Sequence, residues 1–146
     1  MANINVYDIL ERCPDGWKMF YGNCYKYMDT RKTWAEAEAI CNGHTWNGVQ
    51  GHLASVHSEE ENDFVASLAK DRILLGGHDT HKEGQYEWSD GTTFTYQNWA
   101  DNEPSNHGGH GGNEDCIEIP FPASADKHWN DRLCSTKEKF VCKLNV

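Results

Sequence analysis

The sequence predicts one small α+β domain that is stabilised by three disulfides. Two stretches carry helix-start signals followed by apolar residues at helical spacing, and several short aromatic or aliphatic runs lie between turn residues, as strands do. The six cysteines are an even number in a small domain, which is typical of a disulfide framework formed in an oxidising compartment. A chain of 146 residues is long enough for one domain with one hydrophobic core.

Each predicted helix begins with a capping box, which is a Ser or Thr followed three residues later by Glu. The first helix starts at Thr33, with Glu36 as the partner, and ends near Gly43. The second helix starts at Ser58, with Glu61 as the partner. The residues expected to face the core are Trp34, Ala37, Ile40 and Cys41 in the first helix and Phe64, Val65 and Leu68 in the second.

The strands are expected to be short. They are predicted over 20–27, 53–56, 73–77, 86–88, 94–96, 116–119 and 140–142. Residues 1–12 are expected to form an N-terminal extension, and one domain is expected to span 13–146. Between His78 and Asp115 the chain shows little periodicity and much Gly, Asn, Asp and His. A structureless loop of this length in a compact domain is usually functional.

Composition and charge argue against several classes of protein. The formal net charge of -10 argues against binding to nucleic acid or to an anionic membrane. No stretch is long and apolar enough to span a membrane, and the N-terminus lacks the features of a signal peptide. Because the six cysteines indicate an oxidising compartment, we expect a secreted, extracellular protein, and this sequence would then be its mature form. The absence of any CxxC pair disfavours a structural zinc site, and spacing alone does not choose among the 15 possible cysteine pairings.

The long loop and the strands after it carry a set of oxygen ligands that suits calcium, which takes six to eight oxygens at about 2.3–2.6 Å. The expected ligands are Glu103, Ser105, Glu114, Asn130 and Asp131. The first two flank Pro104, and a cis bond there would point both side chains the same way. The last three stand just ahead of Cys116 and Cys134, and a disulfide between these two cysteines would hold them together.

Several motifs, taken jointly and in this order, resemble the C-type lectin family over nearly the whole chain after residue 12. They are Leu74-Leu75-Gly76-Gly77, Glu87-Trp88-Ser89-Asp90-Gly91, Asn98-Trp99, Glu103-Pro104-Ser105, Glu114-Asp115-Cys116 and Trp129-Asn130-Asp131. The resemblance implies two helices and two small antiparallel sheets, the long form of that fold. It also implies the disulfides Cys13–Cys24, Cys41–Cys142 and Cys116–Cys134.

The resemblance further implies a calcium-dependent lectin. Glu103, Ser105, Glu114, Asn130 and Asp131 would ligate a principal calcium and hydrogen-bond two vicinal hydroxyls of a sugar that share the ion. An auxiliary calcium would take Asp79, Glu83, Asn106, Glu114 and Asp115. Asn106 stands where the family often has Asp, so we expect weaker binding at this second site.

The expected sugar is a terminal galactose or N-acetylgalactosamine (GalNAc). Glu103-Pro104-Ser105 matches neither the Glu-Pro-Asn of mannose-type members nor the Gln-Pro-Asp of galactose-type members. The Gly- and His-rich loop over 106–112 is similar to that of galactose-type members, and His107 or His110 would stack on the apolar face of galactose. A mannose- or fucose-type specificity is the alternative.

Other interpretations are weaker. His107 and His110 in a flexible loop make a poor transition-metal site, and no nucleophile elbow or metalloprotease motif indicates an enzyme. A member of this fold that binds protein, ice or mineral is the more serious rival. Trp129 is expected to pack beneath the calcium loop, with a sugar contact as the alternative. Because single sugar sites are weak, we expect a non-covalent homodimer that uses 1–12 or the insertion around Phe121.

Overall fold

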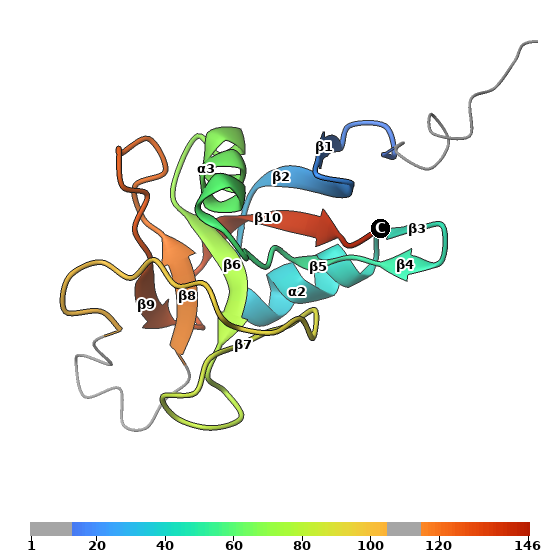
Figure 1. Ribbon diagram of the computed structural model, residues 1–146. Helices are drawn as coiled ribbons and strands as arrows, with labels where there is room; N and C mark the ends of the chain where they lie inside the picture. The colour runs from blue at the N-terminus through green and yellow to red at the C-terminus, as the bar shows by residue number, and fades with distance from the viewer. Residues whose placement is uncertain (1–12, 105–114) are drawn as a thin grey trace, which may run out of the picture.

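The computed structural model describes residues 13–104 and 115–146 (Figure 1). The expected N-terminal extension, 1–12, lies outside these ranges. The helices are α2 (Trp34–Asn42) and α3 (Glu59–Leu68). The strands are β1 (Lys18–Phe20), β2 (Asn23–Lys32), β3 (Thr45–Trp46), β4 (Val49–Gln50), β5 (His52–Leu53), β6 (Ile73–His78), β7 (Glu87–Trp88), β8 (Asp115–Ile119), β9 (Asn130–Leu133) and β10 (Glu138–Leu144).

The strands form two sheets, as expected, but only the smaller one is a small, purely antiparallel sheet. The larger has eight strands in the order β1-β2-β10-β6-β8-β9, with β5 added to β10 and β7 added to β6. Its pairs are antiparallel except that β10 runs parallel to β6, so this sheet is mixed. The smaller sheet is the antiparallel pair β3 and β4. The domain is therefore α+β, as predicted.

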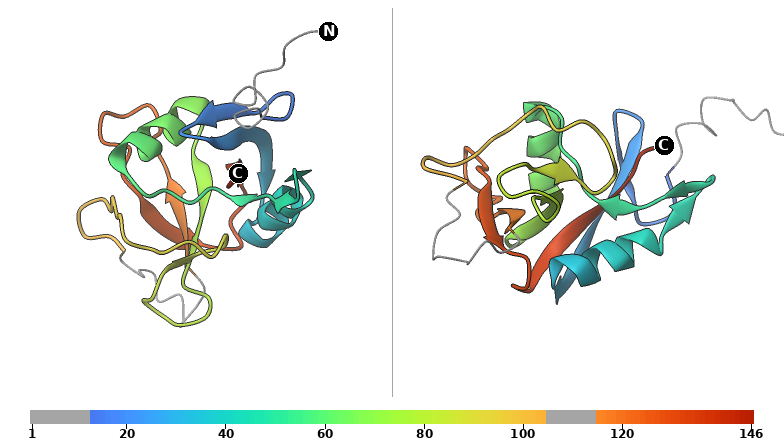
Figure 2. Two further views of the ribbon diagram at one scale, coloured as in Figure 1. Left: turned by 45° about the vertical axis from the view of Figure 1, so that its right-hand side comes forward. Right: turned by 90° about the horizontal axis from the view of Figure 1, so that it is seen from below.

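The two helices cover opposite faces of the large sheet, as the different views in Figures 1 and 2 show. Side chains alternate along a strand, so neighbouring residues face opposite sides. On β6, Leu74 packs with residues of α2, whereas Leu75 packs with residues of α3. The core therefore has two parts, one on each face. Gly76 is needed on this strand, because a Cβ there would lie 2.6 Å from the carbonyl oxygen of Leu53.

The three disulfides are those that the family resemblance implies. Cys13–Cys24 closes the β1–β2 hairpin, Cys41–Cys142 joins α2 to β10, and Cys116–Cys134 joins β8 to the end of β9. All six cysteines are therefore paired within the chain.

Both helices start where the capping signals predict, but only the first has a complete capping box. Thr33 Oγ1 accepts from the backbone N–H of Glu36 at 3.2 Å, and Glu36 Oε1 accepts from the Thr33 N–H at 3.0 Å. At α3, Ser58 caps the helix, but Glu61 accepts instead from the His57 N–H at 2.8 Å. The other Glu61 oxygen accepts from buried groups, the Tyr25 hydroxyl and the Lys143 ammonium, both at 2.5 Å.

Several strand predictions need correction. Of the strand expected over 53–56, only Leu53 lies in a strand, as the last residue of β5. The strand expected over 20–27 is divided between β1 and β2, because Tyr21 and Gly22 adopt positive φ and turn the chain. Residues 94–96 form no strand, since Phe94 and Tyr96 pack against the ring of Trp129 instead. Strand β9 was not expected, because its polar residues gain their pairing only from β8. Within the described ranges, no helix is long and apolar enough to cross a membrane.

Candidate metal centre

Three of the five ligands predicted for the principal calcium, Glu103, Asn130 and Asp131, lie in the described residues. Asn130 and Asp131 begin β9, directly after Trp129. The backbone N–H of Trp129 donates to the carbonyl of Asn98 at 2.8 Å, and the backbone carbonyl of Trp129 accepts from the N–H of Ala100 at 3.0 Å. This pairing lays the loop against the start of β9, so Glu103 is only three residues from the point of attachment.

The side chain of Trp129 anchors this arrangement from below. It is fully buried, and its indole Nε1 donates to Asn62 Oδ1 at 2.8 Å. Aromatic rings surround it with centroid separations of 5.6–6.1 Å; they belong to Trp88, Phe94, Tyr96 and Trp99. The expected packing role is confirmed, and complete burial excludes a direct sugar contact.

The amide of Asn130 is oriented by a carboxylate that the sequence analysis did not include. Asn130 Nδ2 donates to Glu118 Oε2 at 2.8 Å, so the amide nitrogen is directed toward Glu118. The amide oxygen is then the atom that remains to accept or to ligate, and the second N–H can still donate. This is the arrangement required of a residue that binds both a cation and a sugar hydroxyl.

Asp131 belongs to a wider concentration of carboxylates. Its side chain is almost fully buried on β9. Burial raises the pKa of the nearby Tyr86 hydroxyl, and the charges of Asp79, Asp131 and Asp115 raise it further. The hydroxyl of Tyr86 therefore lies within the negative field of both predicted calcium sites, where a bound cation would be stabilised.

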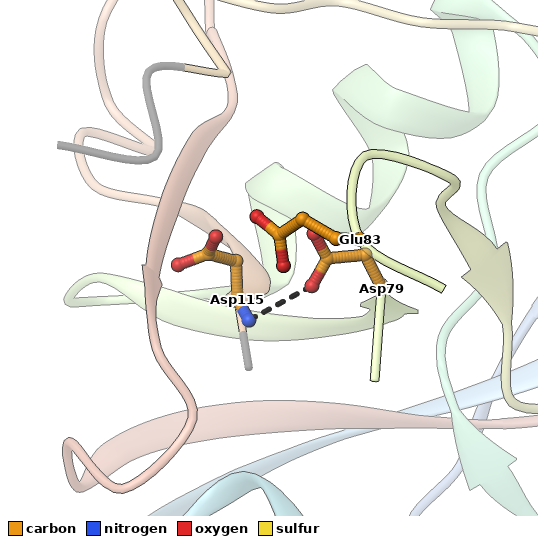
Figure 3. A group of neighbouring side chains, drawn as sticks. All are labelled: Asp79, Glu83 and Asp115. Atoms are coloured by element: carbon orange, nitrogen blue, oxygen red, sulfur yellow. Dashed lines mark hydrogen bonds between the residues drawn. The ribbon is translucent and has the colours of Figure 1, made fainter. Parts of the chain in front are cut away.

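Three of the carboxylates predicted for the auxiliary site lie close together in the described residues. The carboxylates of Asp79, Glu83 and Asp115 gather at one place, with ligand atoms within 4.8 Å of one another (Figure 3). Two oxygens on opposite sides of one calcium lie roughly 5 Å apart, so this spacing fits the ion. Asp79 is held by backbone donors, the N–H of Asp115 at 2.9 Å and that of Gly84 at 3.1 Å. Asp79 and Asp115 are buried, whereas Glu83 is exposed.

The donor chemistry of both groups suits calcium. Each group contains only carboxylate and amide oxygens among the described residues, with neither His nor Cys. Hard cations such as calcium take such ligands, whereas zinc and copper favour imidazole and thiolate. The peptide bond between Glu103 and Pro104 is cis. The remaining predicted ligands and the two candidate stacking residues, Ser105, Asn106, His107, His110 and Glu114, lie outside the described residues.

Beneath Asn130, two buried glutamates form a cluster that the sequence analysis missed. Burial raises the pKa of Glu138 to about 8, and the hydrogen bond and charge of Glu118 act in the same direction. Arg72 lies 3.6 Å from Glu118 and 3.4 Å from Glu138, and Arg132 lies 3.8 Å from Glu118. The signal that could have revealed it is a Glu in the middle of the otherwise apolar strand 116–119.

Comparison with known proteins agrees with this fold. The family model described as "Lectin C-type domain" matches residues 30–144. An "Alpha-N-acetylgalactosamine-specific lectin" of Patiria pectinifera is 37% identical over 146 residues, covering 92% of this chain and 84% of that protein. A "Lectin" of Pleurodeles waltl is 37% identical over 142 residues, covering 93% of this chain and 78% of that one.

A solved structure shares the architecture. The crystal structure of the C-type lectin CEL-I from Cucumaria echinata superimposes with a TM-score of 0.82 at 27% sequence identity. The match covers 92% of this chain and 98% of CEL-I.

Proposed function

The chain belongs to the C-type lectin domain family, a family of non-enzymatic carbohydrate-binding proteins, and we propose that it binds terminal galactose or GalNAc through calcium. In this proposal Glu103, Ser105, Glu114, Asn130 and Asp131 hold the principal ion. Two vicinal hydroxyls of the sugar complete its coordination and hydrogen-bond the same side chains. The expected absence of an active site agrees with family membership.

The observation that carries the proposal is the position of Asn130 beside the loop segment that contains Glu103, since both residues line one pocket. Glu118 takes the inner N–H of the Asn130 amide, so the amide oxygen and the second N–H remain for ion and sugar. Glu103 would accept from one hydroxyl while Asn130 donates to the other. The GalNAc specificity in the name of the Patiria pectinifera relative supports the galactose class over the mannose class. In this proposal His107 or His110 supplies the stacking ring.

Two further parts of the proposal concern the second ion and the assembly. Asp79, Glu83 and Asp115, with Asn106 and Glu114, would hold an auxiliary calcium that orders the loop. The protein would act in an oxidising, extracellular compartment, since all its cysteines are paired. Because no thiol remains to link two chains, the proposed homodimer is non-covalent.

The experiment is a calorimetric titration of GalNAc, galactose, mannose and fucose into the protein, first with calcium and then with excess chelator. We expect GalNAc and galactose to bind only with calcium. Preferred binding of mannose would overturn the sugar class, and GalNAc binding in chelator would overturn the calcium mechanism.

Two matched variants locate the sugar site. Glu103→Gln removes a charge from the principal site, and Glu83→Gln removes one from the auxiliary site. With saturating calcium, the first should lose GalNAc binding and the second should retain it. Equal losses in both variants would contradict the proposed division of the sites.

A further inference from the structure

A pocket of about 480 Å³ lies directly beside the proposed sugar site and shares two residues with it. Glu103 and Asn130 line the pocket and also belong to the principal calcium site. Its volume falls within the range of roughly 300–1,000 Å³ that is usual for small-ligand sites. A glycan whose terminal sugar is bound at Glu103 and Asn130 can therefore extend into this pocket.

Phe121 provides an exposed aromatic ring at the pocket. Phe121 is 66% exposed and lines the pocket, so a ligand in the pocket can reach its ring. Its loop is held in place, because the N–H and hydroxyl of Ser124 donate to the Phe121 carbonyl at 3.0 and 2.7 Å. Ser124 in turn accepts from the Lys127 N–H at 3.0 Å. The ring is therefore presented on a structured loop, which limits the entropy lost on binding.

Arg132 provides hydrogen-bond donors in the same pocket. Its guanidinium lies 3.8 Å from Glu118 and 4.0 Å from Glu138. These ion-pair distances exceed those of good hydrogen bonds, so the charges hold the group while N–H donors remain for a ligand. Hydroxyl oxygens of a sugar are suitable acceptors.

The charges that line the pocket favour a neutral ligand. Among the described residues, the ionisable groups that line the pocket are four carboxylates, two guanidiniums and one imidazole; they belong to Asp101, Glu103, Glu118, Asp126, Arg72, Arg132 and His128. Both guanidiniums already face the buried glutamates, and Asp126 lies 3.5 Å from the ring of His128. An anionic sugar would meet net negative charge here, which disfavours its binding.

We propose that this pocket binds the second, neutral sugar of a galactose- or GalNAc-terminated oligosaccharide. Phe121 stacks on the apolar face of that sugar, and Arg132 donates to its hydroxyls. The inference rests on the proposed function, because the terminal sugar at the calcium delivers the second sugar to the pocket.

The test compares methyl β-galactoside with lactose, which adds one neutral sugar, by calorimetry with saturating calcium. Stacking between aromatic rings contributes about 0.5–1.5 kcal/mol, and a contact of the same size with the second sugar would make lactose bind roughly twofold to twelvefold more tightly. Phe121→Ala should abolish this difference without changing the Kd of methyl β-galactoside, and Phe121→Tyr should preserve it. Tyr21→Ala is the matched control, since Tyr21 is 84% exposed on the distant β1–β2 turn.

Several outcomes would overturn the inference alone. Methyl β-galactoside could bind while lactose gains nothing, or Phe121→Ala could weaken both ligands equally. A gain only for galactose linked to glucuronic acid would show an anion site instead. If sedimentation shows that Phe121→Ala dissociates a dimer while the preference for lactose persists, the ring meets a second copy of the chain. If methyl β-galactoside itself fails to bind, the proposed function fails and the inference falls with it.

Discussion

The Cys116–Cys134 disulfide joins β8 to the end of β9, the strand that carries Asn130 and Asp131 of the proposed principal calcium site, and its removal tests whether this covalent link maintains the site. The cysteines are 18 residues apart, and the chain-entropy relation gives a contribution of roughly 3 kcal/mol at 25 °C. The double substitution to Ala should lower Tm by about 6–12 °C. The four residue pairs between β8 and β9 remain, so only part of this loss should affect binding. We expect the calcium Kd to rise about fivefold, or 1 kcal/mol.

The Cys13–Cys24 disulfide is the matched control. It closes a separation of 11 residues, which gives nearly the same stability term of roughly 3 kcal/mol. Each disulfide also joins one buried and one half-buried cysteine. The control lies in the β1–β2 hairpin, away from β8 and β9 in both figures of the whole molecule. Thermal unfolding and calcium calorimetry on the two double variants provide the comparison. Equal calcium affinities in the two variants would refute the role assigned to Cys116–Cys134.

Two further changes test the structure beneath the site. In chelator, the stability contributed by Glu138 should fall as the pH rises from about 4.5 to 8, because Glu138, whose pKa is raised to about 8, keeps its proton across this range only in the folded state. Glu138→Gln should therefore gain stability relative to wild type across this window, as measured by urea unfolding; a constant difference between the two proteins would contradict the raised pKa. Asn62→Ala should cost about 2–4 kcal/mol, because it removes hydrogen bonds to Trp129 Nε1 and to the Lys127 carbonyl and leaves a buried indole donor without its acceptor. A loss below about 1 kcal/mol in urea unfolding would show that Trp129 is held by ring packing alone.

Elements with local signals could be predicted from the sequence. The start of α2 depends on Thr33 and Glu36, which are close in the chain and bond each other. At α3 the same signal was only half correct, because Glu61 bonds to Tyr25 and Lys143, which are far away in the sequence. Strand β9 was missed for a similar reason, since the polar residues after Trp129 become a strand only beside β8.

Among the site residues, too, those that belong to sequence motifs could be predicted, whereas those that depend on distant partners could not. Asp79, Glu83 and Asp115 were assigned together from family motifs, and the structure gathers their carboxylates. Glu118 was not assigned, because its role depends on the amide of Asn130 and on two arginines from separate segments. Its place in the middle of an otherwise apolar strand is a local sign of burial, but that pattern does not identify these partners. Similarly, Phe121 stood out in the sequence only as part of an insertion, and its pocket is visible only in the fold.

The most direct test of the central claim, that one calcium ion holds the sugar, is the calcium Kd measured with and without saturating GalNAc. If ion and sugar share one site, GalNAc must tighten calcium binding by the same factor by which calcium tightens GalNAc binding. We predict that both factors are large and equal. A calcium Kd that does not change with GalNAc, together with GalNAc binding that persists in chelator, would contradict the account.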